Sequence, residues 1–182
     1  MTHTSITQAL VAATREIGIE DVPEEARETA RHCLLDFLGC AVAGSRASLT
    51  SILIESVVRA EGAVEASLIG RPERATRLSA ALVNGAAGHA LDFDDTHTTM
   101  TGHPSVPVLP ALLALGETEG ASGRQLLDAL VIGVEFECRL GALLGVAHYA
   151  KGFHATGTLG TFGAAAGCAR GSNASCGEWL RH

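Results

Sequence analysis

Residues 84–110 read NGAAGHALDFDDTHTTMTGHPSVPVLP, and this polar stretch separates two predominantly apolar parts of the chain. Six ionisable side chains fall between positions 89 and 103, namely Asp92, Asp94, Asp95, His89, His97 and His103. Unpaired charges are costly to bury, so residues of this kind must lie on a surface or line a pocket. Carboxylates alternate here with imidazoles, and the run breaks at Gly-His-Pro. We therefore interpret the stretch as one half of an active site rather than a solvated charge run.

The parts of the chain on both sides of this stretch have the apolar spacing of helices. We expect helices at residues 6–17, 23–44, 49–60, 78–91, 126–144 and 158–169. Prolines at positions 104, 107 and 110 predict that a further helix after the polar stretch begins late or bends. Ser122 and Gln125 fit a capping box. The segment 65–70 is too short to argue for a sheet, so the predicted fold class is all-α.

Composition excludes several classes of protein. The 182 residues are enough for one domain with a core. Apolar residues make up 47% and aromatic residues 4%, which favours closely packed helices over a β-sandwich. The net charge of −7 and the single lysine, Lys151, argue against a nucleic-acid partner.

His32 lies beside the apolar stripe of the long helix, and we expect it to be packed.

Cysteine usage and the N-terminus bear on the compartment. The five cysteines have no CxxC spacing, which indicates reduced thiols in a cytoplasmic protein. The first residues show no signal peptide, and no apolar run reaches the length of a membrane span. We expect no membrane partner.

Several chemistries could use the DFDDTH segment. Asp92 to Thr96 match the DxDxT pattern of aspartyl phosphatases, but the residues before them favour a helix rather than the required buried strand. A metal site made of Asp92, Asp95, His97 and His103 is chemically possible, although its spacing matches no site that we can justify. Structural roles, with aspartates capping helices and histidines bonded to the backbone, remain open for each residue singly.

Metal-free acid–base catalysis is the interpretation that we favour. Histidine titrates near neutral pH, and a neighbouring aspartate can orient it. His103 lies between a glycine and a proline at an expected helix start, and His154 follows Gly-Phe before another helix. Two histidines at separate helix starts, with aspartates between them, could transfer protons on an anionic small molecule.

Four segments carry a resemblance to a known family. They are LLDFLGCAVAG at 34–44, ALVNGAAGHALDFDDTH at 81–97, GHPSVPVLPALLALGE at 102–117 and GFHATGTLGTFGAAA at 152–166. In these residues the chain resembles the MmgE/PrpD family, which includes 2-methylcitrate dehydratases, cis-aconitate decarboxylases and related epimerases. The resemblance implies the N-terminal part of a helical domain, with an α/β lid domain absent from this sequence. It also implies a homodimer that needs no metal or other cofactor.

The resemblance further implies roles for particular residues. His103, His154 and Asp92 match catalytic positions, and Thr96, Asp95 and His97 are expected to bind substrate. The expected function is a lyase acting on a di- or tricarboxylate, with dehydration of 2-methylcitrate as the first choice. The alternatives are a decarboxylase or epimerase of the same family, or a helical fragment without catalysis.

The end of the sequence departs from the family pattern. After Ala169 the chain reads RGSNASCGEWLRH, and its helical periodicity disappears. We therefore expect an incomplete helical domain over 1–169 and an atypical tail over 170–182, as a truncation or frameshift would produce. The corresponding hypothesis is that the short chain has little or no catalytic activity.

Overall fold

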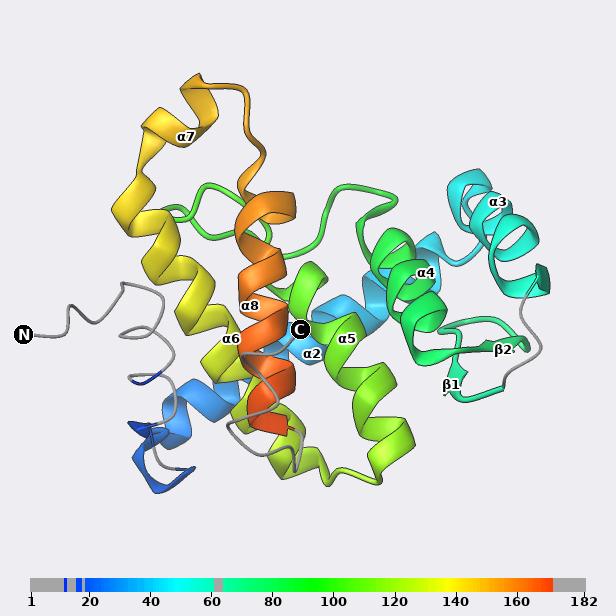
Figure 1. The fold of residues 1–182 in the computed structure, drawn as a ribbon, viewed down its shortest axis with the longest axis horizontal. Coiled ribbons are helices and arrows are strands. Elements are labelled where there is room, and N and C mark those ends of the chain that lie inside the picture. Colours follow the sequence, from blue (N-terminus) through cyan, green and yellow to red (C-terminus); the bar gives the residue numbers. More distant parts are fainter. Residues whose placement is uncertain (1–11, 13–15, 18, 61–63, 172–182) are drawn as a thin grey trace, which may run out of the picture.

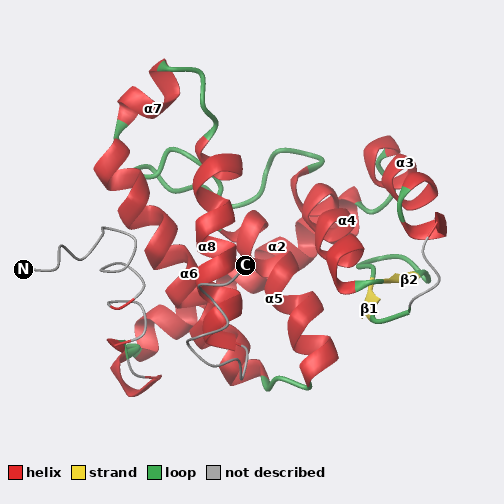
Figure 2. Ribbon diagram, in the orientation of Figure 1, coloured by secondary structure: helices red, strands yellow, loops and turns green. Residues whose placement is uncertain are grey.

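The computed structural model describes the chain except for residues 1–11, 13–15, 18, 61–63 and 172–182. Helices make up nearly all of the described architecture (Figures 1 and 2), which confirms the all-α prediction. The α-helices are α2 (Glu24–Gly44), α3 (Ser48–Ser56), α4 (Arg77–His89), α5 (Ser105–Glu119), α6 (Gly123–Leu144), α7 (Val146–Ala150) and α8 (Ala155–Gly171). The smaller elements are the 3-10 helices η1 (Ile19–Asp21) and η2 (Val58–Ala60) and the strands β1 (Ala66–Ser67) and β2 (Arg74–Ala75). The expected helix over 6–17 lies largely outside the described residues.

The centre of the molecule is formed by α5, which packs against α4 on one side and against α6 and α8 on the other. Helices α6 and α8 lie side by side, and α2 crosses behind α4 and α6 (Figure 1). The main core contains buried residues from four helices, including Phe37 of α2, Ala87 of α4, Leu109 of α5 and Leu130 of α6. This arrangement places the start of α5 next to the end of α4.

Small residues allow α2 and α4 to approach each other closely. A Cβ at Gly44 would lie 2.0 Å from the carbonyl oxygen of Ala87, and a Cβ at Gly88 would lie 2.5 Å from the Phe37 ring. Neither contact can accommodate a methyl group without displacing backbone or a buried aromatic ring. Gly44 is also the last residue of α2, where the sequence predicts the stop.

Of the two alternatives for the helix after the polar stretch, a late start is wrong, and a bend stays a prediction. Helix α5 begins at Ser105, directly after Pro104 at its N-cap, and continues through Pro110 to Glu119. Pro107 is tolerated because it lies in the first turn, where N–H groups have no partner within the helix. The polar stretch is therefore followed at once by a rigid helix.

Helix α6 begins with the predicted capping box. The Ser122 hydroxyl accepts from the Gln125 N–H, and the Gln125 side chain accepts from the Ser122 N–H.

A buried ion pair that the sequence does not predict joins this helix to α2, with 2.7 Å between Arg27 Nε and Asp128 Oδ1. His32, by contrast, is exposed, with one nitrogen 3.5 Å from Glu28, so the expectation that it packs is wrong.

A two-stranded antiparallel sheet that the sequence does not predict lies beside α3 and α4 (Figure 1). The Asn84 side chain stabilises it from α4, since its oxygen accepts from the Ile69 N–H and its amide donates to the Ser67 carbonyl. Helix α4 runs from Arg77 to His89, so Asn84-Gly85 lies inside it and the helix expected over 78–91 ends two residues early.

The C-terminal part of the described chain is the helix α8, which includes Arg170 and Gly171. The division of the chain at residue 169 stays a prediction. Among the described residues no single helix has both the length and the apolarity of a membrane span, although the bent pair α2 and α3 meets both criteria when counted together.

Candidate active site

The polar stretch folds into an irregular loop between α4 and α5. His89 is the last residue of α4, and His103 lies two residues before the start of α5. The loop turns back on itself through a bridge between His97 and Gly102, and Asp92 and Thr101 adopt left-handed backbone conformations with φ of 55° and 56°. These turns bring the two ends of the loop together.

Asp94 lies between the two imidazoles at the ends of this loop. Its side chain is 2% exposed, and its Oδ1 is 2.9 Å from His89 Nδ1. His103 Nδ1 is 3.3 Å from Asp94 Oδ2 and also 3.3 Å from the Asp94 carbonyl oxygen. The two rings meet edge to face, with centroids 4.7 Å apart. One buried carboxylate thus contacts both histidines.

Asp92 lies on the opposite, exposed side of the same two rings. Its Oδ1 is 3.6 Å from His103 Nε2 and 4.0 Å from His89 Nε2. Ligand atoms of His89, Asp92, Asp94 and His103 all lie within 4.8 Å of one another, and this donor set suits a divalent cation. The same geometry suits proton transfer, because both Nε2 atoms face one exposed point.

His154 reaches this cluster from a distant part of the sequence. It lies directly before α8, and its ring centroid is 6.5 Å from that of His89. The hydroxyl of Tyr149, on α7, is 3.2 Å from His154 Nδ1. The His103 N–H donates to the buried Thr156 hydroxyl, which fixes the loop to the start of α8. Three of the sequence-predicted site residues, His103, His154 and Asp92, are therefore brought together around His89.

The three residues expected to bind substrate have different surroundings. Asp95 accepts from the N–H and the hydroxyl of Ser105, so its carboxylate caps the start of α5. His97 accepts the Met100 N–H at its Nδ1, inside the loop, while Thr96 is exposed. These contacts give Asp95 and His97 structural roles, and their part in substrate binding stays a prediction.

His89 and Asp94 are the residues of the site that sequence reasoning did not single out. Both belong to the polar cluster, but the sequence does not show which members face inward. The spacing of five residues between them carried a signal, because it places a loop carboxylate back over the last turn of the preceding helix. Only the loop conformation shows that Asp94 is the buried member.

Glu137 of α6 is fully buried, with its carboxylate against Gly160 and Gly163 of α8. Neither carboxylate oxygen has a hydrogen-bond partner among the described residues. Burial, together with the negative charge of Asp95, raises the pKa of Glu137 to about 9. Burial also raises the pKa of the Cys138 thiol to about 12, which makes it a poor nucleophile. Glu137 is therefore neutral at pH 7.

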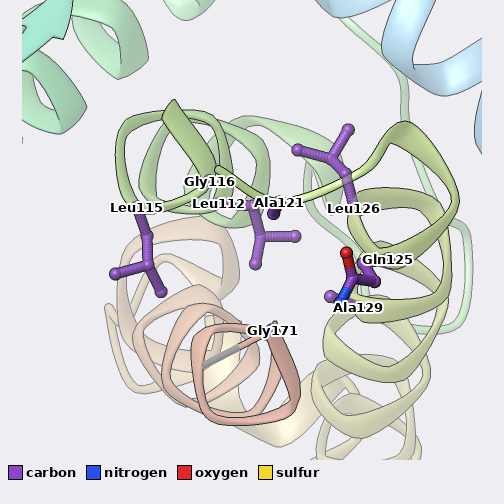
Figure 3. Close-up of a pocket in the computed structure, with 8 residues that line it drawn as sticks. All are labelled: Leu112, Leu115, Gly116, Ala121, Gln125, Leu126, Ala129 and Gly171. Carbon is purple, nitrogen blue, oxygen red and sulfur yellow. The ribbon is translucent and has the colours of Figure 1, made fainter. Parts of the chain in front are cut away.

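A small apolar pocket lies toward the other end of α5 (Figure 3). Leu112, Leu115, Leu126 and Ala129 line it together with the end of α8. Its volume of about 10 Å³ is near the minimum for one water molecule, and its apolar walls offer few partners for one. We assign it no function.

Comparison with known proteins finds related sequences. Residues 8–175 match the MmgE/PrpD N-terminal domain. The chain is 32% identical over 178 residues to the cis-aconitate decarboxylase of Homo sapiens, which covers 91% of the chain and 36% of that protein. It is 30% identical over 170 residues to the cis-aconitate decarboxylase-like protein oryM of Aspergillus oryzae, covering 89% of the chain and 35% of that protein.

A more distant relative is the cis-aconitate decarboxylase of Aspergillus terreus, which is 26% identical over 161 residues, or 85% of the chain and 33% of that protein. The chain spans about a third of the length of these relatives. The match to the family nevertheless extends over most of the chain, from residue 8 to residue 175. The chain belongs to the MmgE/PrpD family, and its residues form the N-terminal helical domain of that family.

Proposed function

We propose that this chain carries the histidine half of a lyase site that acts on a polycarboxylate by metal-free proton transfer. The observation that carries the proposal is the clustering of His103 and His154 around His89, with the Nε2 atoms of His89 and His103 facing the exposed Asp92. An imidazole within hydrogen-bond reach of a substrate can exchange protons with its carbon or oxygen near neutral pH.

The relatives named above favour decarboxylation over the dehydration of 2-methylcitrate that the sequence suggested first. In decarboxylation of cis-aconitate, a C–C bond breaks and CO₂ leaves, and the electron pair left on carbon takes a proton from an imidazolium. In dehydration, an imidazole removes a proton from carbon, and the electron pair expels hydroxide, which is protonated as it leaves. Both reactions need one imidazole beside carbon, and we assign this role to His103, with His154 as the second proton-transfer group.

The substrate carboxylates need positive partners that the central cluster lacks. Asp92 and Asp94 make the cluster acidic while its histidines are neutral, so an anionic substrate would be repelled unless cations are supplied from elsewhere. Thr96, exposed on the same loop, is proposed to donate to a substrate carboxylate.

The test is turnover of cis-aconitate and of 2-methylcitrate, measured as CO₂ release and as water loss. Replacement His103→Ala should lower any turnover by about 10²–10⁴-fold, the usual contribution of one acid–base group. His32→Ala is the matched control, because His32 is exposed on α2, with one nitrogen 3.5 Å from Glu28. Equal turnover by His103→Ala and the wild-type chain would contradict the proposal. Absence of turnover in the wild-type chain, with binding retained, favours the alternative of a non-catalytic helical fragment.

A further inference from the structure

The protonation pattern of the two central histidines follows from their contacts with Asp94. A carboxylate is an acceptor only, so a neutral imidazole that hydrogen-bonds to it must carry its hydrogen on the bonded nitrogen. For His89 that nitrogen is Nδ1, 2.9 Å from Asp94 Oδ1. For His103 it is also Nδ1, whose hydrogen bond goes to the Asp94 carbonyl oxygen at 3.3 Å, likewise an acceptor only, with the carboxylate Oδ2 at 3.3 Å beside it. Each neutral ring therefore has an N–H at Nδ1 and a free lone pair at Nε2.

The two free lone pairs face the same place. Both Nε2 atoms lie within 4.0 Å of Asp92 Oδ1, on the side of the rings away from Asp94. Asp94 is buried whereas the Asp92 side chain is 78% exposed, so the shared point is open to a ligand. A carboxylate behind each ring also stabilises the positive charge when Nε2 takes a proton.

The two rings do not depend on Asp94 equally. His103 Nδ1 also lies 3.3 Å from the Asp94 carbonyl oxygen, which accepts a hydrogen bond whatever the side chain is. Among the described residues, the hydrogen-bond partners of His89 Nδ1 are the two carboxylate oxygens of Asp94, at 2.9 Å and 3.2 Å. Without the Asp94 carboxylate, His89 should therefore no longer be held in its Nδ1–H form, whereas His103 should largely keep its Nδ1–H form.

We propose that His89 and His103 form one proton-handling pair, in which Asp94 is the positioning residue that holds both rings by Nδ1. This inference rests on the proposed function for its chemistry, but not for its geometry. In the decarboxylation favoured above, a C–C bond breaks and CO₂ leaves, and the electron pair left on carbon forms a C–H bond with the proton held at Nε2 of the His103 imidazolium, whose N–H bond breaks. His89 Nε2 then passes a proton taken from solvent to the emptied Nε2 of His103, which restores the imidazolium.

The test begins with tautomers, measured by two-bond ¹H–¹⁵N NMR on the ¹⁵N-histidine-labelled chain at a pH where the rings are neutral. His89 and His103 should be protonated at Nδ1. His97 should show the opposite tautomer, because its Nδ1 accepts the Met100 N–H. In Asp94→Asn, His89 should shift toward the Nε2–H form while His103 changes little. Asp36→Asn, an exposed site on α2, is the control.

Three outcomes overturn the inference. They are a predominantly Nε2–H form of His89 in the wild-type chain, a His103 that responds more than His89 in Asp94→Asn, and no response of either ring. The first outcome can be tested even where Asp94→Asn fails to fold, because it requires only the wild-type chain.

A second pair of variants separates positioning from proton transfer. His89→Asn keeps a donor near the place of Nδ1 but removes Nε2, whereas His89→Gln extends toward the place of Nε2. Where the chain turns over cis-aconitate, His89→Asn should lower kcat at least about tenfold with little change in KM. An unchanged kcat would overturn the role of His89. A chain with the expected tautomers and no turnover would contradict the proposed function and leave the assignment of Asp94 intact.

Discussion

At the scale of single residues, the most unusual group is the Glu137 carboxyl, which is fully buried without a hydrogen-bond partner among the described residues. Its pKa is about 9 in the folded chain, against an ordinary value of 4.5. Between these two values the folded state binds the proton and the unfolded state has lost it. The free energy of unfolding therefore falls as the pH rises through this window, by up to about 1.4 kcal/mol per pH unit.

Replacement Glu137→Gln should remove this dependence, because the amide stays neutral. In urea unfolding between pH 4.5 and 9, the free energy of unfolding of Glu137→Gln should rise steadily relative to that of the wild type as the pH rises. Glu119→Gln, at an exposed site at the end of α5, should leave the pH profile as it is. Parallel profiles for Glu137→Gln and the wild type would show that Glu137 does not titrate in this way.

A further expectation at this scale concerns metal ions. Proton transfer needs the Nε2 atoms of His89 and His103, and a cation bound there would occupy their lone pairs. We therefore expect dialysis against a chelator to leave both thermal unfolding and any turnover of cis-aconitate unchanged. A loss of turnover that zinc or magnesium restores would instead support the metal site that the donor set permits.

The residues of the site were partly predictable from the sequence. His103, Asp92 and His154 stand out by their neighbours, and the structure brings them together. Asp94 and His89 could not be distinguished from the other polar residues, because their inward orientation depends on the left-handed turn at Asp92. Such a turn is uncommon for a residue other than glycine, and sequence patterns rarely indicate it.

At the scale of helices, the close crossing of α2 and α4 gives the clearest test of packing. Gly44→Ala should destabilise the chain by about 1–3 kcal/mol, because the added methyl would meet backbone of α4. Gly39→Ala, on the same helix, has nothing within 4 Å of the added Cβ and should stabilise it by up to about 1 kcal/mol. Chemical unfolding of both variants measures the difference. Equal changes in the free energy of unfolding for the two variants would contradict a close contact between α2 and α4 at Gly44.

The buried pair of Arg27 and Asp128 allows a second test between α2 and α6. Arg27→Met alone should lower the urea midpoint, because it removes the close partner of the buried Asp128 carboxylate and leaves it with the exposed Arg124 side chain, 3.9 Å away. The double replacement Arg27→Met and Asp128→Leu should recover much of the loss, since no unpaired charge remains. A double variant that is no more stable than Arg27→Met would contradict this explanation.

Helix boundaries were predictable where apolar spacing and caps agree, as in α2, α4 and α6. A late start of α5, one of the two alternatives predicted from its prolines, is wrong, because Pro104 lies at the N-cap and Pro107 in the first turn, where proline is compatible with a helix, and α5 also continues through Pro110. The β1–β2 sheet was missed because it depends on contacts with Asn84 of α4 rather than on its own short sequence. Tertiary contacts thus decided the case of the sheet.

At the scale of the whole molecule, we propose that the chain forms a homodimer, as the resemblance implies. Light scattering coupled to gel filtration should give about twice the chain mass of 18.7 kDa. A mass equal to one chain at every concentration tested would contradict the proposal.

The central claim is that the three histidines form a polycarboxylate site, and ligand titration tests it without requiring catalysis. Addition of cis-aconitate to the ¹⁵N-histidine-labelled chain should shift the ring signals of His89, His103 and His154 together, with one binding curve. The exposed His32 should not move, and Asp92→Asn should alter the curve. Unmoved signals of the three histidines up to the solubility limit of cis-aconitate, or shifts shared equally by His32, would contradict the account.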